Sequence, residues 1–263
     1  MDQQLLPQPL TNTSFWDDHW SSMTLPLEIR KSEALFFDEI TRIFDQFLPA
    51  DRRLSVLELG GAPGQWLVYL YKKFGYKIHA LDNSTVGVQK TQENFQILGI
   101  PGTAAVGNIF DHTLGRTDFD VVYSLGLIEH FTDPLPVVEA HLRFLRAGGV
   151  LVIGCPNFRG IHGFLERRLA PSVLAMHNLK VMDEASWESW ETKLDLKLLF
   201  RGYIGGFEPG LIRVCESEAF RRKLLFTLVA MLRFILNRRI MRPLRRLNAP
   251  WWSGYLIGIY RKP

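Results

Sequence analysis

The sequence predicts an α/β fold in which a mostly parallel sheet of seven strands carries helices on both faces. Two observations lead to this prediction. From residue 54 onward, short apolar runs alternate with helical segments at the spacing of β-α-β crossover units. The first of these runs ends in a glycine-rich turn, VLELGGAPGQW at residues 56–66, as a buried parallel strand does before a helix.

The individual elements follow from apolar runs, capping residues and glycines. The predicted strands are residues 54–59, 76–82, 103–106, 119–125, 150–155, 194–204 and 255–261. The predicted crossover helices are residues 64–74 stopped by Gly75, a helix capped by Ser84 and ended by Gly99, and one opened by Asp133–Pro134 and closed by the glycines at 148–149. Residues 158–192 interrupt this alternation with helices and loops.

The composition is that of a globular protein with a sizeable core. Apolar residues make up 47% of the chain and charged residues 22%, which is ordinary for a folded domain. Two cysteines imply no disulfide framework, the opening MDQQLLPQPL is no secretory signal, and no run approaches the ~18 apolar residues of a membrane span. We therefore expect a cytoplasmic protein that is either soluble or attached to a membrane surface.

Positive charge is concentrated near the end of the chain. Residues 219–263 contain eleven Lys or Arg and no Asp or Glu, and subtracting that +11 from the total of +4 leaves −7 for residues 1–218. We predict a helical lid segment at 1–48, a core domain at 49–215 and 248–263, and a basic amphipathic helical insertion at 216–247, before the last strand. The insertion fits contact with an anionic surface, and equally a solvated face that keeps the protein soluble.

The glycine turn indicates which ligand the fold binds. A turn between a buried strand and a helix places backbone N–H groups and the positive end of the helix dipole together. The dinucleotide pattern G-x-G-x-x-G fails here, because Ala62 and Gln65 stand where its second and third glycines belong. The turn reads E-x-G-x-A-x-G from Glu58 to Gly64, and it suits a ligand without phosphates better than a pyrophosphate.

Together with three later segments, this turn resembles the class I S-adenosylmethionine-dependent methyltransferases. The later segments are HALDNS (79–84), FDVVYSLGLIEHFTDP (119–134) and LRAGGVLVIGCPN (145–157), so the resemblance covers roughly residues 54–157. It implies a Rossmann-like fold, S-adenosylmethionine as cofactor, and an acid after the second strand for the ribose hydroxyls. The cofactor-binding residues that it implies are Glu58, Gly60, Gly61, Gly64, Asp82, Asn83, Asn108, Ile109 and Leu125.

Several of these residues have a purely structural alternative. The glycines can simply shape a tight turn, and Asp82 can cap the helix that begins near Ser84. Ala62 departs from the family's middle glycine, and Asn108 stands where the family often has an aspartate. Asn108 and Ile109 are evenly divided between adenine contact and ordinary turn packing.

Catalysis by such an enzyme needs few groups, since the sulfonium is already a reactive methyl donor. A base is needed only where the acceptor must lose a proton, and histidine titrates in the right range. Among Glu129, His130, His162 and His177, we favour His130, which follows the fourth strand, and then His177. Each could equally be packed or hydrogen-bonded without a catalytic role. No metal ligands are predicted.

The segment before the first strand carries two tryptophans at helical spacing, Trp16 and Trp20, in FWDDHW (15–20). Segments in this place commonly cover the cofactor and the acceptor in the family that the chain resembles. The alternative is an amphipathic helix that only packs two large apolar side chains.

The acceptor is narrowed by what the sequence lacks. SLGL follows the fourth strand where nucleic-acid amino-methylases carry an Asn/Asp-Pro-Pro-aromatic tetrad, so nucleic acid is disfavoured. Arginines and apolar residues on opposite arcs of 238–247, followed by Trp251, favour an anionic membrane and a lipid, quinone or lipid-linked acceptor. The alternatives are a soluble small-metabolite methyltransferase with the insertion covering its active site, an oxidoreductase, and a non-catalytic scaffold of the same fold.

Overall fold

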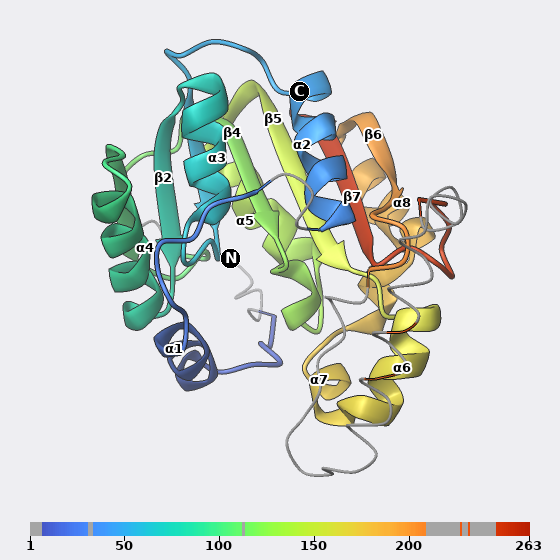
Figure 1. Ribbon diagram of the computed structural model, residues 1–263. Coiled ribbons are helices and arrows are strands. Elements are labelled where there is room, and N and C mark those ends of the chain that lie inside the picture. The colour runs from blue at the N-terminus through green and yellow to red at the C-terminus, as the bar shows by residue number, and fades with distance from the viewer. Residues whose placement is uncertain (1–6, 31–33, 112–113, 209–226, 228–230, 232–245) are drawn as a thin grey trace.

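The protein has a seven-stranded sheet between two layers of helices (Figure 1). The computed structural model describes residues 7–30, 34–111, 114–208, 227, 231 and 246–263. The strands are β1 (Ser55–Leu59), β2 (Lys77–Asp82), β3 (Gly102–Val106), β4 (Phe119–Leu125), β5 (Leu145–Pro156), β6 (Lys197–Ile204) and β7 (Tyr255–Arg261). The helices are α1 (Thr13–Ser21), α2 (Leu35–Phe47), α3 (Gln65–Phe74), α4 (Thr85–Ile97), η1 (Ile128–His130), α5 (Leu135–Phe144), α6 (Ile161–Leu169), α7 (Pro171–Ala175), η2 (Leu179–Met182) and α8 (Glu184–Lys193).

The strand order is β3-β2-β1-β4-β5-β7-β6. Strands β1 to β5 pair in parallel, whereas β7 runs antiparallel to both β5 and β6. The predicted α/β fold with seven mostly parallel strands is therefore confirmed. The order reverses direction between β1 and β4, and in open α/β sheets that is where ligands bind, beyond the carboxyl ends of the strands.

Alternate strand residues fill two separate cores, one on each face of the sheet. Val56 of β1 packs on the face covered by α2, α3 and α4, while its neighbour Leu57 packs on the face covered by α5 and α8. This two-sided burial explains the nearly continuous apolar runs from which the strands are predicted. It also makes the sheet a rigid base for the loops at its carboxyl edge.

Capping residues set the helix ends that position the site. The Ser84 hydroxyl accepts a hydrogen bond from Gly87 N at 2.8 Å at the start of α4, and Gly75 ends α3 with φ of +75°. One predicted boundary is wrong. The pair Gly148–Gly149 does not close α5, because that helix ends at Phe144 and the glycines lie in the irregular first part of β5.

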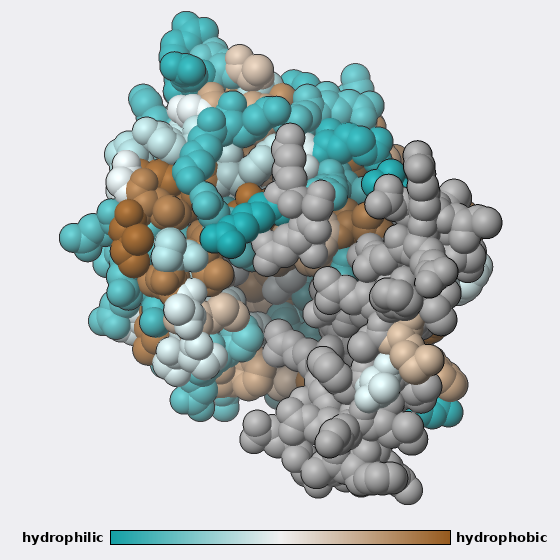
Figure 2. Space-filling model, viewed as in Figure 1, coloured by the Kyte–Doolittle hydropathy of each residue, from teal (hydrophilic) through white to brown (hydrophobic). Residues whose placement is uncertain are grey.

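The two predicted additions to the core domain fare differently. Within the segment at 1–48, α2 packs on the sheet and its Phe44 is fully buried, whereas α1 lies beside α4 at the lower left of Figure 1. The predicted insertion at 216–247 falls largely outside the described residues. Among the described residues, no helix has both the length and the apolar character needed to span a membrane. In the same view, Figure 2 shows apolar surface on the side of α4.

Candidate active site

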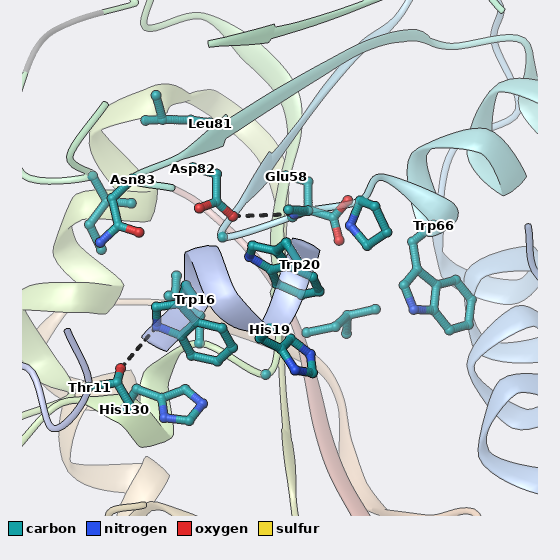
Figure 3. Close-up of a pocket in the computed structure, with 18 of the residues that line it drawn as sticks. Thr11, Trp16, His19, Trp20, Glu58, Trp66, Leu81, Asp82, Asn83 and His130 are labelled. Carbon is teal, nitrogen blue, oxygen red and sulfur yellow. Dashed lines mark hydrogen bonds between the residues drawn. The ribbon is translucent and has the colours of Figure 1, made fainter. Parts of the chain in front are cut away.

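A cavity of about 360 Å³ opens beyond the carboxyl ends of β1, β2 and β4. Its lining combines the sheet loops with the segment before the first strand. These residues are Pro9, Thr11, Trp16, His19, Trp20, Met23, Leu27, Glu58, Gly60, Gly61, Ala62, Pro63, Gln65, Trp66, Leu81, Asp82, Asn83, Gly107, Asn108, Ile109, Leu125, Gly126, Leu127, His130 and Phe131. Figure 3 shows the indoles of Trp16 and Trp20 between the acids Glu58 and Asp82 and the imidazole of His130.

The glycine turn brings the main chain close to the Glu58 side chain. A Cβ on Gly61 would lie 2.3 Å from Cγ of Glu58, so only glycine fits there. Gly60 has φ of +66°, a left-handed conformation that side chains disfavour. Gly64, also predicted to bind cofactor, does not line the cavity. It stands at the start of α3, where a Cβ would meet Phe95 and Thr91 at 2.9 Å.

Glu58 is an acid buried without a complete set of partners. It is 5% exposed, and its Oε2 has no hydrogen-bond partner among the described residues. Burial raises the pKa of Glu58 to about 8, and the nearby Asp82 adds to the increase. An acid in this state attracts a cationic or hydrogen-bond-donating ligand group, which would restore the interactions lost on burial.

Asp82, at the end of β2, is held by backbone N–H groups. Its Oδ1 accepts from Ser84 N at 2.9 Å and its Oδ2 from Ala62 N at 3.3 Å, the contact dashed in Figure 3. Burial raises the pKa of Asp82, and the hydrogen bonds from Ser84 and Ala62 oppose that rise. Asp82 also has the structural role considered in the sequence analysis, because it fixes the turn before α4. It also lines the cavity.

The loop after β3 closes the neighbouring side of the cavity. Asn83, Asn108, Ile109 and Leu125, all predicted to bind the cofactor, line the cavity. Asn108 also shapes its own turn, because its Oδ1 accepts from Phe110 N at 3.1 Å. Ile109 is 8% exposed and offers an apolar surface.

The segment before the first strand is fastened on both sides of the cavity. On one side, Leu10 N donates to His130 O at 2.7 Å, and Pro9 pairs with Phe131 in an isolated bridge. On the other side, four side-chain hydrogen bonds tie the segment to α4. They join Asp17 to Ser84, Lys90 to Met23 O, and Asn94 to the main chain of Leu27. The segment that contains α1 therefore covers the cavity and is attached by hydrogen bonds on both sides of it.

His130 forms the end of the cavity opposite the acids. Its Nδ1 lies 2.9 Å from the carbonyl oxygen of Met176, and its ring contacts the edge of Trp16 at 5.0 Å between centroids. The indole of Trp16 in turn donates to Thr11 Oγ1 at 3.0 Å. His177 does not line the cavity but packs behind His130, with ring centroids 4.6 Å apart. Beside them, Glu129 is 1% exposed, and burial raises its pKa to about 8.

These features suit a nucleoside that carries an amino acid. The buried Oε2 of Glu58 has no hydrogen-bond partner among the described residues, so it can accept from a ligand. The backbone at Gly60 and Gly61 lets a ligand approach closely, and Asp82 can accept hydrogen bonds from vicinal hydroxyls. A seven-stranded sheet with a reversed last strand, combined with this turn and these acids, defines the class I S-adenosylmethionine-dependent methyltransferases.

Comparison with known proteins identifies the family. A family model for the methyltransferase domain matches residues 29–200, and the chain belongs to this family. It is an enzyme, a methyltransferase with S-adenosylmethionine as its cofactor.

Solved structures with a similar fold are known. Phosphoethanolamine N-methyltransferase 2 of Haemonchus contortus, in complex with S-adenosyl-L-methionine, is 17% identical with a TM-score of 0.61 over 86% of this chain and 52% of that one. Geranyl diphosphate methyltransferase, in complex with GPP and sinefungin, is 16% identical with a TM-score of 0.56 over 86% and 77%. The [4+2]-cyclase SpnF is 15% identical with a TM-score of 0.60 over 98% and 97%. At such identities the likeness shows the fold alone.

Part of the cavity wall escapes sequence reasoning. His19, Met23 and Leu27 line the cavity, and no spacing signal in residues 11–27 distinguishes them from residues that only pack. Trp66 lies in the helix predicted at 64–74, and nothing in the sequence distinguishes it from a residue that only packs. For Glu129 and His177 the signal exists in the residue types, but only the fold brings them together.

Proposed function

We propose that this enzyme transfers a methyl group in line to an oxygen or nitrogen nucleophile of a small-molecule or lipid-like acceptor that lies beside His130. The observation that carries the proposal is the cavity with Glu58 and Asp82 on one wall and His130 on the other (Figure 3). Glu58 and Asp82 would hold S-adenosylmethionine on their side of the cavity, which would leave the His130 side for the acceptor.

On the cofactor side, the residues act by binding and orienting. Asp82 would accept hydrogen bonds from the ribose hydroxyls, and Glu58 would accept from the ammonium of the methionine part. Asn83, Asn108 and Ile109 would lie near the adenosine, and Leu125 near the methionine part. When bound, S-adenosylmethionine supplies an electrophilic methyl group on a positively charged sulfur. Gly60 and Gly61 let the main chain approach the methionine part closely, and Gly64 keeps α3 against α4.

On the acceptor side, His130 takes the proton that the nucleophile loses. The Met176 carbonyl can only accept a hydrogen bond, so Nδ1 of His130 carries the hydrogen and Nε2 carries the lone pair. His177 packs behind His130 and orients it. Trp16 and Trp20 exclude water from this space, which lowers the cost of bringing the nucleophile into line.

The character of the lining favours an apolar or partly apolar acceptor. Aromatic and aliphatic side chains outnumber charged ones around the His130 end of the cavity, with Trp16, Leu127 and Phe131 closest to it. A lipid, quinone or lipid-linked molecule fits this surface, and so does a small apolar metabolite. Nucleic acid does not, because its recognition relies on a basic groove.

Attachment to an anionic membrane extends this proposal. Leu247, Trp251 and Phe164 expose 43%, 57% and 51% of their surface, and the Trp251 main chain contacts the start of α6, the helix that carries Phe164. Arginines at 238–246 precede Trp251 in the sequence, and apolar residues beside basic ones suit the interface of an anionic bilayer. The alternative is an insertion that covers the active site of a soluble enzyme.

Two measurements test the function. Calorimetry should detect S-adenosylhomocysteine binding, with no binding of NAD or NADP. Incubation with methyl-labelled S-adenosylmethionine and fractionated lipid and metabolite extracts should label one small-molecule fraction, and His130→Asn should lower that labelling by at least about 100-fold. Label appearing only in nucleic acid or protein would refute the proposed acceptor class.

Membrane attachment needs a separate assay. We expect the full chain to float with anionic liposomes and not with neutral ones. Changing Arg238, Arg239, Arg242, Arg245 and Arg246 to Glu should abolish flotation, while the same reversal at Lys72 and Lys73 should leave it unchanged. Flotation that is equal with and without the arginines would end the membrane proposal.

A further inference from the structure

Three potential metal ligands meet behind the acceptor end of the cavity. Glu129 and His130 lie in η1 after β4, and His177 lies in the turn after α7. A carboxylate oxygen of Glu129 and one ring nitrogen of each histidine all lie within 4.8 Å of one another. The sequence predicts no metal ligands, because His177 is far from the other two along the chain and only the fold unites them.

Both imidazoles are oriented by main-chain carbonyls. Nδ1 of His130 lies 2.9 Å from Met176 O, and Nδ1 of His177 lies 2.6 Å from Val173 O. Since a carbonyl only accepts, each ring keeps its hydrogen on Nδ1 and its lone pair on Nε2. A hydrogen bond from the second ring nitrogen to a carbonyl is the usual support of a histidine that binds a metal.

The loop that carries His177 is fixed to the loop that carries the other two ligands. Asn178 N donates to Glu129 O at 2.6 Å, and its Nδ2 donates to Phe131 O and Thr132 O, each at 3.0 Å. These hydrogen bonds hold the loop that carries His177 against the loop that carries Glu129 and His130. Because these residues are already held in place, they lose little further conformational entropy when they bind a cation.

Glu129 supplies an independent sign that a ligand is missing from this set. The residue is 1% exposed, and its Oε2 has no hydrogen-bond partner within the described part of the chain. Its other oxygen lies 3.9 Å from Nε2 of His130, too far for a hydrogen bond. A buried carboxylate oxygen without a partner is costly, and a cation bound by both oxygens of the Glu129 carboxylate and by the imidazoles would satisfy it.

We infer that Glu129, His130 and His177 form a binding site for a divalent first-row transition metal of the zinc class. Two imidazoles and one carboxylate are the ligand set of many zinc and iron sites that keep a position open. Metal–ligand bonds of about 2.1 Å require ligand atoms roughly 3.4 Å apart, so the three side chains must draw together by about 1 Å. Rotation of the carboxylate and imidazoles can supply this.

The site deepens the proposed function, on which it rests for the position of the acceptor. His130 lines the cavity and Glu129 lies behind it, so the open coordination position would face the acceptor. A bound cation would hold an acceptor oxygen and favour its deprotonated form. His130 would then position the acceptor through the metal instead of taking its proton.

Cobalt(II) offers a direct probe, because its visible ligand-field absorption reports the coordinating atoms. We expect the chelator-treated full-length protein to bind one Co²⁺ per chain, with absorption bands that Zn²⁺ abolishes. Glu129→Gln and His177→Gln should each weaken Co²⁺ binding by at least about 30-fold. His79→Gln is the matched control, since His79 lies on β2 and bonds Thr103 Oγ1 at 2.7 Å. It should bind Co²⁺ like the wild type.

S-adenosylhomocysteine binding separates this proposal from the proposed function. Both ligand variants should bind it with wild-type affinity, which shows that they are folded. Absence of Co²⁺ binding to the wild type, or binding that both variants retain, would overturn the metal site. Neither result would touch the proposed methyl transfer, which fails only if the wild type binds no S-adenosylhomocysteine or labels no small-molecule fraction.

Discussion

The two walls of the cavity are built in different ways. The wall with Glu58 and Asp82 comes from turns that directly follow parallel strands, so consecutive residues already hold its geometry. The wall with Trp16 and His130 comes from segments far apart in the chain, joined by hydrogen bonds such as Leu10 N to His130 O. The first wall suits a cofactor common to a large family. The second can vary without disturbing the sheet.

The largest effect is expected from filling the glycine turn. A methyl group at Gly61 would lie 2.3 Å from Cγ of Glu58, so Gly61→Ala must displace the acid and distort the turn. We expect the affinity for S-adenosylhomocysteine to fall by about 100-fold in calorimetry. Gly202→Ala is the control, because its Cβ would meet Phe200 at an ordinary 3.5 Å. Equal affinities in the two variants would show that the cofactor wall is not built on this turn.

The charge of Asp82 should matter next. Asp82→Asn keeps the shape but replaces one accepting oxygen with an NH2 group, so the side chain can no longer accept from both Ser84 N and Ala62 N. Together with the weaker bond to the ribose that we propose for this residue, we expect roughly 30-fold weaker S-adenosylhomocysteine binding. Asp120→Asn is a matched control at the opposite end of the sheet, where Asp120 accepts from Ser55 N at 2.8 Å. If Asp82→Asn bound S-adenosylhomocysteine with the wild-type dissociation constant, the proposal that Asp82 binds the ribose would be refuted.

The sequence predicts the fold, and it also predicts most of the residues that line one side of the cavity, for a physical reason. Burial on both faces leaves apolar runs, helices leave caps such as Ser84, and close backbone approach leaves glycines, so each signal lies within a few residues. Eight of the nine predicted cofactor residues line the cavity. Gly64 is the one that does not, because a glycine needed for helix packing looks the same in the sequence as one needed by a ligand.

The wall with Trp16 and His130 leaves no comparable signal in the sequence. His130 is predicted from its place after β4, but its neighbours depend on tertiary contacts, such as Asn178 against the η1 loop and Asp17 against Ser84. The boundary at Gly148–Gly149 is mispredicted because β5 begins before the glycines, in an irregular pairing with β4 that a local pattern does not reveal.

The attachment of α1 provides a sharper comparison of the two walls. Asp17 accepts a hydrogen bond from the Ser84 hydroxyl, so Asp17→Ala loosens the cover while leaving Asp82 and the glycine turn in place. We expect S-adenosylhomocysteine to dissociate about 5- to 10-fold faster in stopped-flow measurements of tryptophan fluorescence. The neighbouring acid Asp18 is exposed, and Asp18→Ala should leave the rate unchanged. Equal rates in both variants would mean that α1 does not retain the cofactor.

The smallest effect concerns the ligand-free stability of the cofactor wall. Burial raises the pKa of Glu58 from 4.5 to about 8, so the folded state holds a proton that the unfolded state has already released between these values. The contribution of Glu58 to stability is therefore lost as the pH rises from 4.5 to 8. Glu58→Gln removes this dependence, although the new amide brings its own unpaired donor into the same buried place. We expect the melting temperature of the variant, relative to that of the wild type, to rise by several degrees between pH 4.5 and pH 8. A difference that did not change between these two pH values would show that the folded protein does not raise the pKa of Glu58.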